Sequence, residues 1–206
     1  MASLEQVKSV MKKLSSMNGV GNHLCFFGGS VPYIYHNKQS GREHSDIDVL
    51  VDERYMGVIR EMAQSRDNYH EELDSLALNL DDDYGLKIFI DGVYVEFEPM
   101  SIRDGMFIRK SFSPDKSVAG LEQIPFEELE DLMIPIDIDG VQTFCESMEL
   151  IKVGKEKYKR EKDLKDIDFI DSMGIDTEKY ERVKKAVEMS NTSIGTYEEL
   201  RKRVMW

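Results

Sequence analysis

Apolar residues recur at helical spacing in the first part of the chain and then give way to short apolar runs. The helical spacing predicts an amphipathic helix over residues 4–17 that ends at Asn18-Gly19. The short runs predict strands, with one further helix over residues 53–65 among them. The strands are expected at residues 23–27, 46–52, 76–80, 86–90, 93–98 and 106–112. Asp91-Gly92 separates two of these runs and predicts a tight hairpin.

The second half of the chain has a different pattern. From Phe126 onward the apolar positions return to helical spacing, and Asp176 is placed to cap one of the helices. Helices are expected over residues 141–151, 164–170, 176–189 and 196–199. We therefore expect an α/β domain over residues 1–124 and a C-terminal helical domain over residues 125–206.

The composition is that of an ordinary globular protein. Hydrophobic residues make up 41% of the 206 residues and charged residues 33%, a balance that supports a buried core. No apolar stretch approaches the roughly 20 residues of a membrane-spanning helix, and the N-terminus lacks a signal-peptide pattern. Cys25 and Cys145 each lie inside an apolar run, so free buried thiols and a reducing cytoplasm are expected.

The formal net charge of −13 narrows the choice of partners. An acidic surface repels polyanions, so binding to extended nucleic acid is disfavoured. A cationic small molecule or a protein acceptor suits this charge better. The composition defines no oligomeric state.

The strand over residues 46–52 begins with two carboxylates. Residues i and i+2 of a strand point to the same face, so Asp46 and Asp48 project together while Ile47 and Val49 enter the core. Two carboxylates about 7 Å apart can converge on a pair of Mg²⁺ ions, which prefer oxygen ligands. Such a pair holds the attacking and leaving oxygens of a phosphoryl displacement.

A glycine-rich turn precedes this strand. Gly28-Gly29-Ser30 follows the strand over residues 23–27, where the glycines let backbone N–H groups approach a polyphosphate and Ser30 adds a hydroxyl donor. A plain strand-to-helix turn is the structural alternative. The turn and the aspartate pair are each common alone, and their combination is far more specific.

Gly28-Gly29-Ser30 with Asp46-Ile47-Asp48 resembles the signature of the DNA polymerase beta-like nucleotidyltransferase superfamily. That superfamily includes aminoglycoside nucleotidyltransferases and AbiEii-type toxins. The resemblance implies a mixed sheet with flanking helices, in which the turn and the aspartate pair lie on adjacent strands. It also implies two Mg²⁺ ions and transfer of a nucleoside monophosphate from an NTP such as ATP to an acceptor, with release of pyrophosphate.

Members of this superfamily supply a third carboxylate from a later strand. Glu96 and Glu98 share one face of the strand over residues 93–98, and Glu96 is favoured because it lies between Val95 and Phe97. Glu98 is the substitute, since it precedes Pro99. The chain departs from the family pattern in its long segment between Ser30 and Asp46 and in having Glu at this third position.

A basic stripe in the second half is a further candidate for nucleotide binding. Lys152, Lys155, Lys159 and Lys162 share one face if a single helix continues past Gly154. The surrounding residues are similar to an Arg-x-Lys-Asp run in the helical domains of AbiEii-like and antibiotic-modifying members. Lys155, Lys159 and Lys162 are therefore candidates to face the triphosphate, and a solvated helix face is the alternative.

Three functions remain in view at this point. The leading one is a Mg²⁺-dependent nucleotidyltransferase that modifies a hydroxyl of a small molecule, such as an aminoglycoside-like compound. An AbiEii-type toxin that nucleotidylates RNA or protein is a variant of it. A catalytically silent nucleotide-binding module is the third, and the intact Gly-Gly-Ser and Asp-x-Asp motifs argue against it. The identities of the acceptor and of the NTP cannot be read from the sequence.

Overall fold

The protein is built around one mixed sheet. The computed structural model describes residues 2–65, 69–77, 83–112 and 119–195. Within these ranges the strand order is β7-β8-β1-β2-β4-β5-β6-β9, and β3 pairs with β4. The strands are β1 (Leu24–Phe27), β2 (Asp46–Asp52), β3 (Leu86–Ile90), β4 (Val93–Arg103), β5 (Met106–Phe112), β6 (Ala119–Pro125), β7 (Met133–Ile138), β8 (Val141–Glu146) and β9 (Asn191–Gly195).

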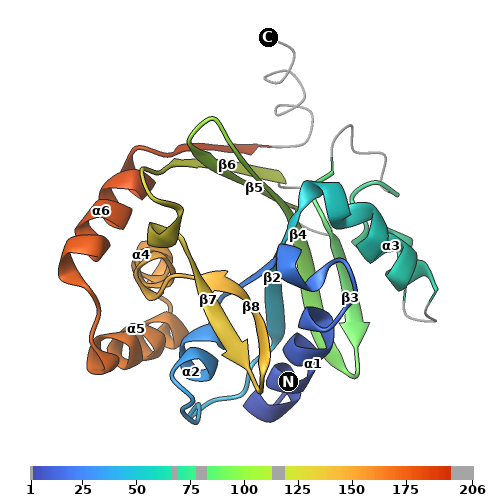
Figure 1. The fold of residues 1–206 in the computed structure, drawn as a ribbon, viewed down its shortest axis with the longest axis horizontal. Coiled ribbons are helices and arrows are strands. Elements are labelled where there is room, and N and C mark those ends of the chain that lie inside the picture. Colours follow the sequence, from blue (N-terminus) through green and yellow to red (C-terminus); the bar gives the residue numbers. More distant parts are fainter. Residues whose placement is uncertain (1, 66–68, 78–82, 113–118, 196–206) are drawn as a thin grey trace.

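The helices flank this sheet. In the view of Figure 1, α1 and α3 lie on one side of β2 and β4, and α4, α5 and α6 gather on the other. The helices are α1 (Leu4–Ser15), α2 (Val31–Tyr35), α3 (Met56–Gln64), α4 (Met148–Tyr158), α5 (Glu161–Met173) and α6 (Thr177–Glu188). No helix in the described ranges combines the length and the apolar character needed to cross a bilayer.

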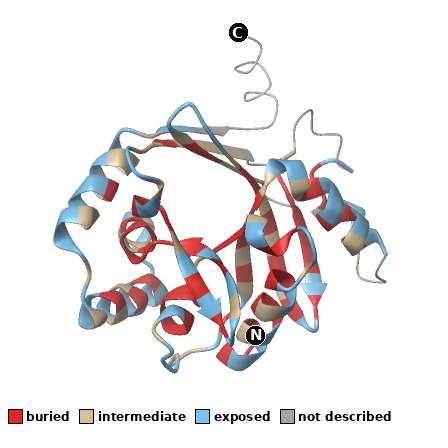
Figure 2. Ribbon diagram, viewed as in Figure 1, coloured by how far each residue is buried: buried red, intermediate tan, exposed pale blue. Residues whose placement is uncertain are grey.

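Two apolar cores lie against opposite faces of the central strands. Phe26 and Val49 pack into the first core, together with buried residues of α1 and α3. Their neighbours Cys25 and Leu50 pack into the second core, with residues of β5, β6, α4 and α6. This division follows from the two-residue repeat of a strand, which sends successive side chains to opposite faces. Figure 2 shows buried residues along the central strands.

Most elements of the first half confirm the sequence-based expectations. The helix at the start, β2 and β5 form where the apolar pattern predicts them. Asp91 and Gly92 have φ angles of 49° and 81°, the left-handed pair that a tight hairpin between β3 and β4 requires. Strand β4 is longer than expected, because it runs through Pro99 to Arg103 and pairs with β5 over its last residues. The α/β mixed sheet with flanking helices is therefore confirmed.

The expectation of an all-helical pattern after Phe126 is wrong. Strands β7 and β8 form a hairpin there, and β8 pairs in parallel with β1. The apolar spacing of residues 141–151 fits a helix by number, yet Asp139-Gly140 makes the left-handed turn of a hairpin, with φ angles of 50° and 85°. Ser147 then caps α4 by accepting a hydrogen bond from the backbone N–H of Leu150, so the stripe is divided between a strand and a helix.

Other expectations have mixed outcomes. Asp176 caps α6 as expected, by accepting a hydrogen bond from the backbone N–H of Lys179. Residues 75–77 form a turn rather than the start of a strand. Residues 78–80 and the helix expected over residues 196–199 lie outside the described residues. The domain boundary at residues 124/125 falls inside β6, and the division into two domains stays a prediction.

Candidate active site

Three carboxylates meet where β2 begins. Strand β2 pairs in parallel with β4, and this register places Asp48 directly opposite Glu96. One oxygen from each of Asp46, Asp48 and Glu96 lies within 4.8 Å of the others. We refer to these three residues as the carboxylate cluster. The structure thus brings together the aspartate pair and the favoured third carboxylate.

The environment of the cluster suits a cation. Burial raises the pKa of Asp48 well above its usual value, and the negative charges of Asp46 and Glu96 raise it further. Like charges held this close are unfavourable unless a cation lies between them. Three carboxylate oxygens at this spacing are a donor set for a hard divalent ion such as Mg²⁺. The cluster therefore fits the metal that the resemblance implies.

The two glutamates of β4 have different surroundings. The Lys87 ammonium donates a hydrogen bond of 2.8 Å to Oε2 of Glu96, which holds that side chain in the cluster. Glu98 lies two residues further along β4 and lines a neighbouring cavity instead. Burial raises the pKa of Glu98 to about 7, and the positive charge of Arg109 opposes part of this shift.

The glycine turn is shaped by charged neighbours. Gly28 has a φ of +86°, and a Cβ atom there would lie 2.2 Å from Oδ2 of Asp48. A Cβ on Gly29 would lie 2.1 Å from Nη2 of Arg42. The positive φ of Gly28 favours glycine there, and at both positions a Cβ would displace the end of a charged side chain that now approaches the turn. Ser30 follows and is buried at the start of α2. Strand pairing of Phe27 with Asp48 places the turn beside the carboxylate cluster.

A buried ionic group adjoins this turn, and the sequence analysis did not identify it. Asp166 of α5 is fully buried and accepts hydrogen bonds from Nη2 of Arg42 at 2.8 Å and from Nζ of Lys155 at 2.7 Å. The Tyr33 hydroxyl also donates to Asp166, and burial followed by this negative charge raises the pKa of Tyr33 to about 12. The sequence feature that could have indicated this group is the presence of aspartates, Asp166 among them, within the basic run of residues 159–167.

The basic stripe is not formed on one helix. Helix α4 continues past Gly154 but ends at Tyr158, and Lys159 adopts a left-handed conformation with φ of 52°. A new helix, α5, starts at Glu161, where the Asp163 carboxylate accepts a hydrogen bond from the backbone N–H of the N-cap residue Arg160. Lys155 lines the cavity. The expectation that the stripe lies on a single helix is therefore wrong. Lys159 and Lys162 are exposed and are not among the residues that line the cavity, and their role in nucleotide binding stays a prediction.

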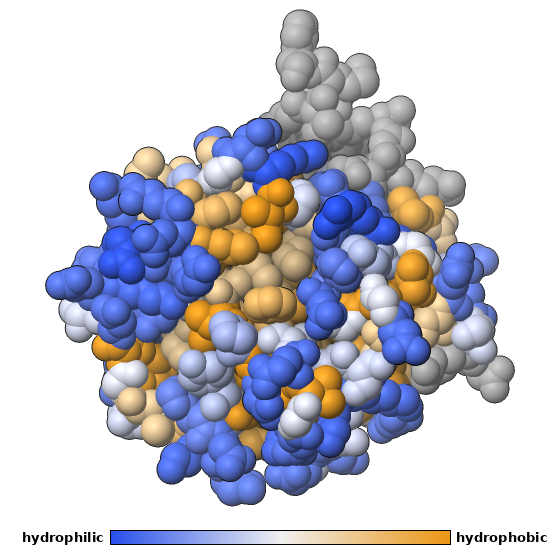
Figure 3. All heavy atoms as spheres, viewed as in Figure 1, coloured by the Kyte–Doolittle hydropathy of each residue, from blue (hydrophilic) through white to orange (hydrophobic). Residues whose placement is uncertain are grey.

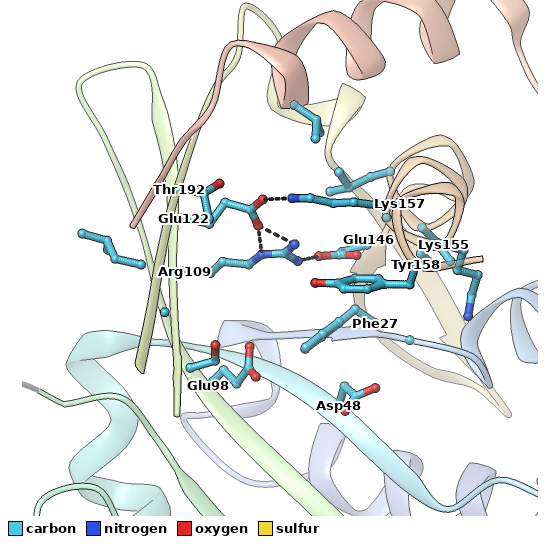
Figure 4. A pocket seen from close by; sticks show the side chains of 18 of the residues that line it. Phe27, Asp48, Glu98, Arg109, Glu122, Glu146, Lys155, Lys157, Tyr158 and Thr192 are labelled. Carbon is cyan, nitrogen blue, oxygen red and sulfur yellow. Dashed lines mark hydrogen bonds and ion pairs between the residues drawn. The ribbon is translucent and has the colours of Figure 1, made fainter. Parts of the chain in front are cut away.

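The cavity beside the cluster has a volume of ≈ 320 Å³ and lies between the sheet and α4. Figure 4 shows Arg109, Glu122 and Glu146 together on one side of it, with Asp48 and Lys155 away from them. The Arg109 guanidinium, from β5, donates to Glu122 of β6 at 2.5 Å and to Glu146 of β8 at 2.7 Å. The face drawn in Figure 3 has apolar surface near its centre with hydrophilic side chains around it.

Comparisons with known proteins agree with this architecture. No protein-family model and no curated protein matches the chain. Among solved structures, the lincosamide antibiotic adenylyltransferase LnuA, bound to lincomycin, aligns with a TM-score of 0.57 and 16% identity, over 84% of this chain and 99% of that one. The solution structure of the antibiotic-resistance factor ANT(2'')-Ia aligns with a TM-score of 0.55 and 18% identity, over 98% of each chain.

A crystal structure of ANT(2'')-Ia in complex with adenylyl-2''-tobramycin gives a TM-score of 0.54 and 18% identity, over 89% of this chain and 97% of that one. The chain therefore has the fold of the antibiotic nucleotidyltransferases. This confirms the expected resemblance at the level of the fold.

Proposed function

We propose that this protein is a Mg²⁺-dependent nucleotidyltransferase that transfers a nucleoside monophosphate from an NTP to a hydroxyl of a small molecule. The observation that carries the proposal is the carboxylate cluster, whose oxygens lie within 4.8 Å of one another beside the Gly28–Ser30 turn. The fold in which they lie is that of enzymes whose names describe nucleotidyl transfer to antibiotics.

The cluster would hold the metal. Asp46, Asp48 and Glu96 each offer one oxygen, and Lys87 keeps Glu96 in place. Bound at these oxygens, two Mg²⁺ ions would supply charge stabilisation to the attacking and leaving oxygens of an in-line displacement. Glu98 takes the place of Glu96 in this proposal only if substitution of Glu96 has no effect.

The phosphates of the NTP would lie against the glycine turn. The backbone of Gly28 and Gly29 and the hydroxyl of Ser30 contribute donors there, and Lys155 contributes a positive charge from α4. The acceptor oxygen forms a bond to the α-phosphorus while the bond from that phosphorus to the β-phosphate oxygen breaks. Pyrophosphate leaves, and the hydroxyl proton passes to a carboxylate, for which Glu96 is our first choice.

A small molecule is a better acceptor here than RNA. The cavity adjoining the cluster is lined by acidic and basic residues alike, and the formal net charge of −13 of the chain disfavours a polyanionic acceptor. The cavity volume of ≈ 320 Å³ is within the range of small-molecule sites. We therefore place nucleotidylation of RNA, as by an AbiEii-type toxin, behind this proposal.

A direct assay tests the function. The protein is incubated with Mg²⁺, each labelled NTP in turn and a panel of hydroxyl-bearing acceptors, and both pyrophosphate and labelled product are measured. We expect stoichiometric pyrophosphate and product with at least one pair, and none with EDTA. Absence of product together with absence of NTP binding in calorimetry would contradict the proposal. NTP binding without any turnover on small molecules, RNA or protein would favour a silent nucleotide-binding module.

A further inference from the structure

Two aromatic side chains lie beside the carboxylate cluster and outside the cavity. Strand pairing places Tyr94 of β4 directly opposite Asp46 of β2 at one edge and opposite Phe89 of β3 at the other. Directly opposite residues share a face of the sheet, so Asp46, Tyr94 and Phe89 form a row across three strands. We call Phe89 and Tyr94 the aromatic ledge. Neither is among the described residues that line the cavity.

The two rings of the ledge belong to neither apolar core in the described ranges. The neighbours of Phe89 along β3, Ile88 and Ile90, are buried in the first core, because successive residues of a strand point to opposite faces. Phe89 itself is 44% exposed. The ring centroids of Phe89 and Tyr94 are 5.2 Å apart, and the ring planes are tilted by 56°. The structural alternative is that the rings only stabilise the hairpin as a cross-strand pair.

The ledge and the glycine turn lie on opposite sides of the β2 aspartates. Strand β1, which ends in the turn, pairs with one edge of β2, and β4 followed by β3 lies at the other edge. In a phosphoryl displacement the attacking and leaving oxygens lie on opposite sides of the phosphorus. With the pyrophosphate against the glycine turn, the acceptor therefore approaches from the side of β4 and the ledge.

The spacing of the row indicates which part of the acceptor reaches the ledge. Neighbouring strands lie about 5 Å apart, so the ledge extends from about 5 to about 10 Å beyond Asp46. An acceptor with its hydroxyl at the cluster reaches this surface with the group next to that hydroxyl. Aromatic rings prefer offset-stacked and edge-to-face contacts, and two rings tilted against each other offer both to a third ring.

We propose that the aromatic ledge binds an aromatic ring of the acceptor while the acceptor hydroxyl lies at the carboxylate cluster. Phe89 is the residue that sets this specificity, because its ring is the exposed one. An acceptor that is hydrophilic over its whole surface gains nothing from the ledge, whereas an aromatic ring is removed from water there. This proposal rests on the proposed function and names the acceptor class for the same site.

Matched acceptors test the ledge by binding. Titration calorimetry compares the phenyl and methyl glycosides of glucose and of galactose, which differ only in the aromatic ring. All titrations are done with Mg²⁺ and a non-hydrolysable ATP analogue present. We expect the phenyl compound of at least one sugar to bind about fivefold or more tightly than its methyl partner. Equal affinities for both pairs, or no binding of any phenyl compound, overturn the proposal.

Variants of Phe89 locate the effect. Phe89→Ala should lower the affinity for the phenyl compound about fivefold, to that of the methyl compound, and Phe89→Tyr should keep the preference because it keeps a ring. Val58→Ala is the matched control, at a position of α3 that is 43% exposed, and should change neither affinity. If the rings only stabilise the hairpin, Phe89→Ala lowers the melting temperature and leaves the phenyl preference unchanged, which overturns the proposal.

Nucleotide binding separates failure of the ledge from failure of the proposed function. Phe89→Ala and Phe89→Tyr should bind the ATP analogue within about twofold of the wild type. If Phe89→Ala weakens the ATP analogue more than the phenyl compound, the ledge holds the nucleobase and the proposal is wrong. Nucleotide binding without a phenyl preference would exclude this acceptor class and leave the proposed function intact. Absence of nucleotide binding in the wild type would instead contradict the proposed function itself.

Discussion

The carboxylate cluster and the ionic contacts that close the cavity are built in different ways. The cluster depends on strand alternation in β2 and on its register with β4, where Asp48 lies opposite Glu96. The ionic contacts join side chains of remote elements, as in Arg109 with Glu146 and Lys155 with Asp166. Backbone pairing thus sets the geometry of the carboxylates, while charge pairs between remote elements stabilise the residues that surround the cavity. Substitutions in the first region should reduce activity, and substitutions in the second should reduce stability.

The largest effect is expected in the cluster. Asp48→Asn should lower turnover about a thousandfold, because it removes a charged oxygen ligand at the metal site. The same change should raise the melting temperature measured without metal. The pKa of Asp48 is raised in the folded protein, so its ionised form destabilises the fold at neutral pH and Asn relieves this.

Asp52→Asn is the control for this prediction, since Asp52 lies on the same strand and outside the cluster. Turnover and thermal unfolding are measured for both variants. Wild-type turnover in Asp48→Asn would refute the assignment of the cluster. A large loss of stability in that variant would refute the contrast between the two regions.

The second effect concerns Asp166. Asp166→Asn should lower the free energy of unfolding by about 3–5 kcal/mol, because two partly buried cations, Arg42 and Lys155, lose their shared buried partner. Asp168→Asn, at an exposed position of the same helix, should change it by less than about 0.5 kcal/mol. Urea unfolding at pH 7 measures both. Equal free energies of unfolding for the two variants would show that Asp166 and its ion pairs do not stabilise the fold.

The glycine turn belongs to the first region and depends on the positive φ of Gly28. Gly28→Ala should destabilise the protein by about 1–3 kcal/mol and lower turnover, since its Cβ collides with Asp48 at a positive φ. Gly57→Ala is the matched change in α3, where a Cβ meets nothing within 4 Å, and it should be neutral or stabilising by up to about 1 kcal/mol. Chemical denaturation and product assays on both variants test this difference.

A smaller effect is expected from pH. The hydrogen-bonded Arg182 guanidinium lowers the pKa of Asp131, so this pair contributes stability above the unfolded pKa of about 4. That contribution is lost as the pH falls through the lower pKa of the folded state. Because Arg182 is half exposed, solvent screens the pair and the contribution of this pair to stability is small. Melting temperatures of wild type and Asp131→Asn should differ at pH 7 and converge at acidic pH; a constant difference would contradict this origin.

The smallest effect is expected at Lys159. Its side chain is exposed at the end of α4 and is not among the residues that line the cavity, so Lys159→Glu should leave stability within about 0.5 kcal/mol. The KM for NTP is measured in parallel with that of Lys155→Glu, which should rise. A comparable rise for Lys159→Glu would return this lysine to the nucleotide site.

The sequence was sufficient where chemistry follows from local spacing. Asp46 and Asp48 share a face because they are two residues apart on a strand, and Asp91-Gly92 identifies its own hairpin. Apolar spacing alone predicted a helix at residues 141–146, which form a strand, because a short apolar run fits the helical repeat and the strand repeat equally well. The overlooked signal was Asp139-Gly140, which has the same turn chemistry as Asp91-Gly92.

The charge pairs between remote elements were not predictable in the same way. Arg109 and Glu146 are 37 residues apart and meet only because β5 and β8 approach the same cavity. The spacing of residues along the chain does not predict such a contact. It depends on β4, which pairs with β2 over its first residues and with β5 over its last ones. Arg42 and Asp166, 124 residues apart, are a second example.

The parallel pairing of β1 with β8 has a consequence for synthesis on the ribosome. Strand β1 ends at Phe27, yet the strand that covers one of its edges ends at Glu146. Until that segment has emerged, the nascent chain carries β1 with an unpaired edge, which is a template for aggregation. Pairing of both edges of β1 therefore waits for a contact across more than half of the chain, and such distant contacts slow folding. Expression yield should accordingly depend on the rate of translation and on chaperone supply.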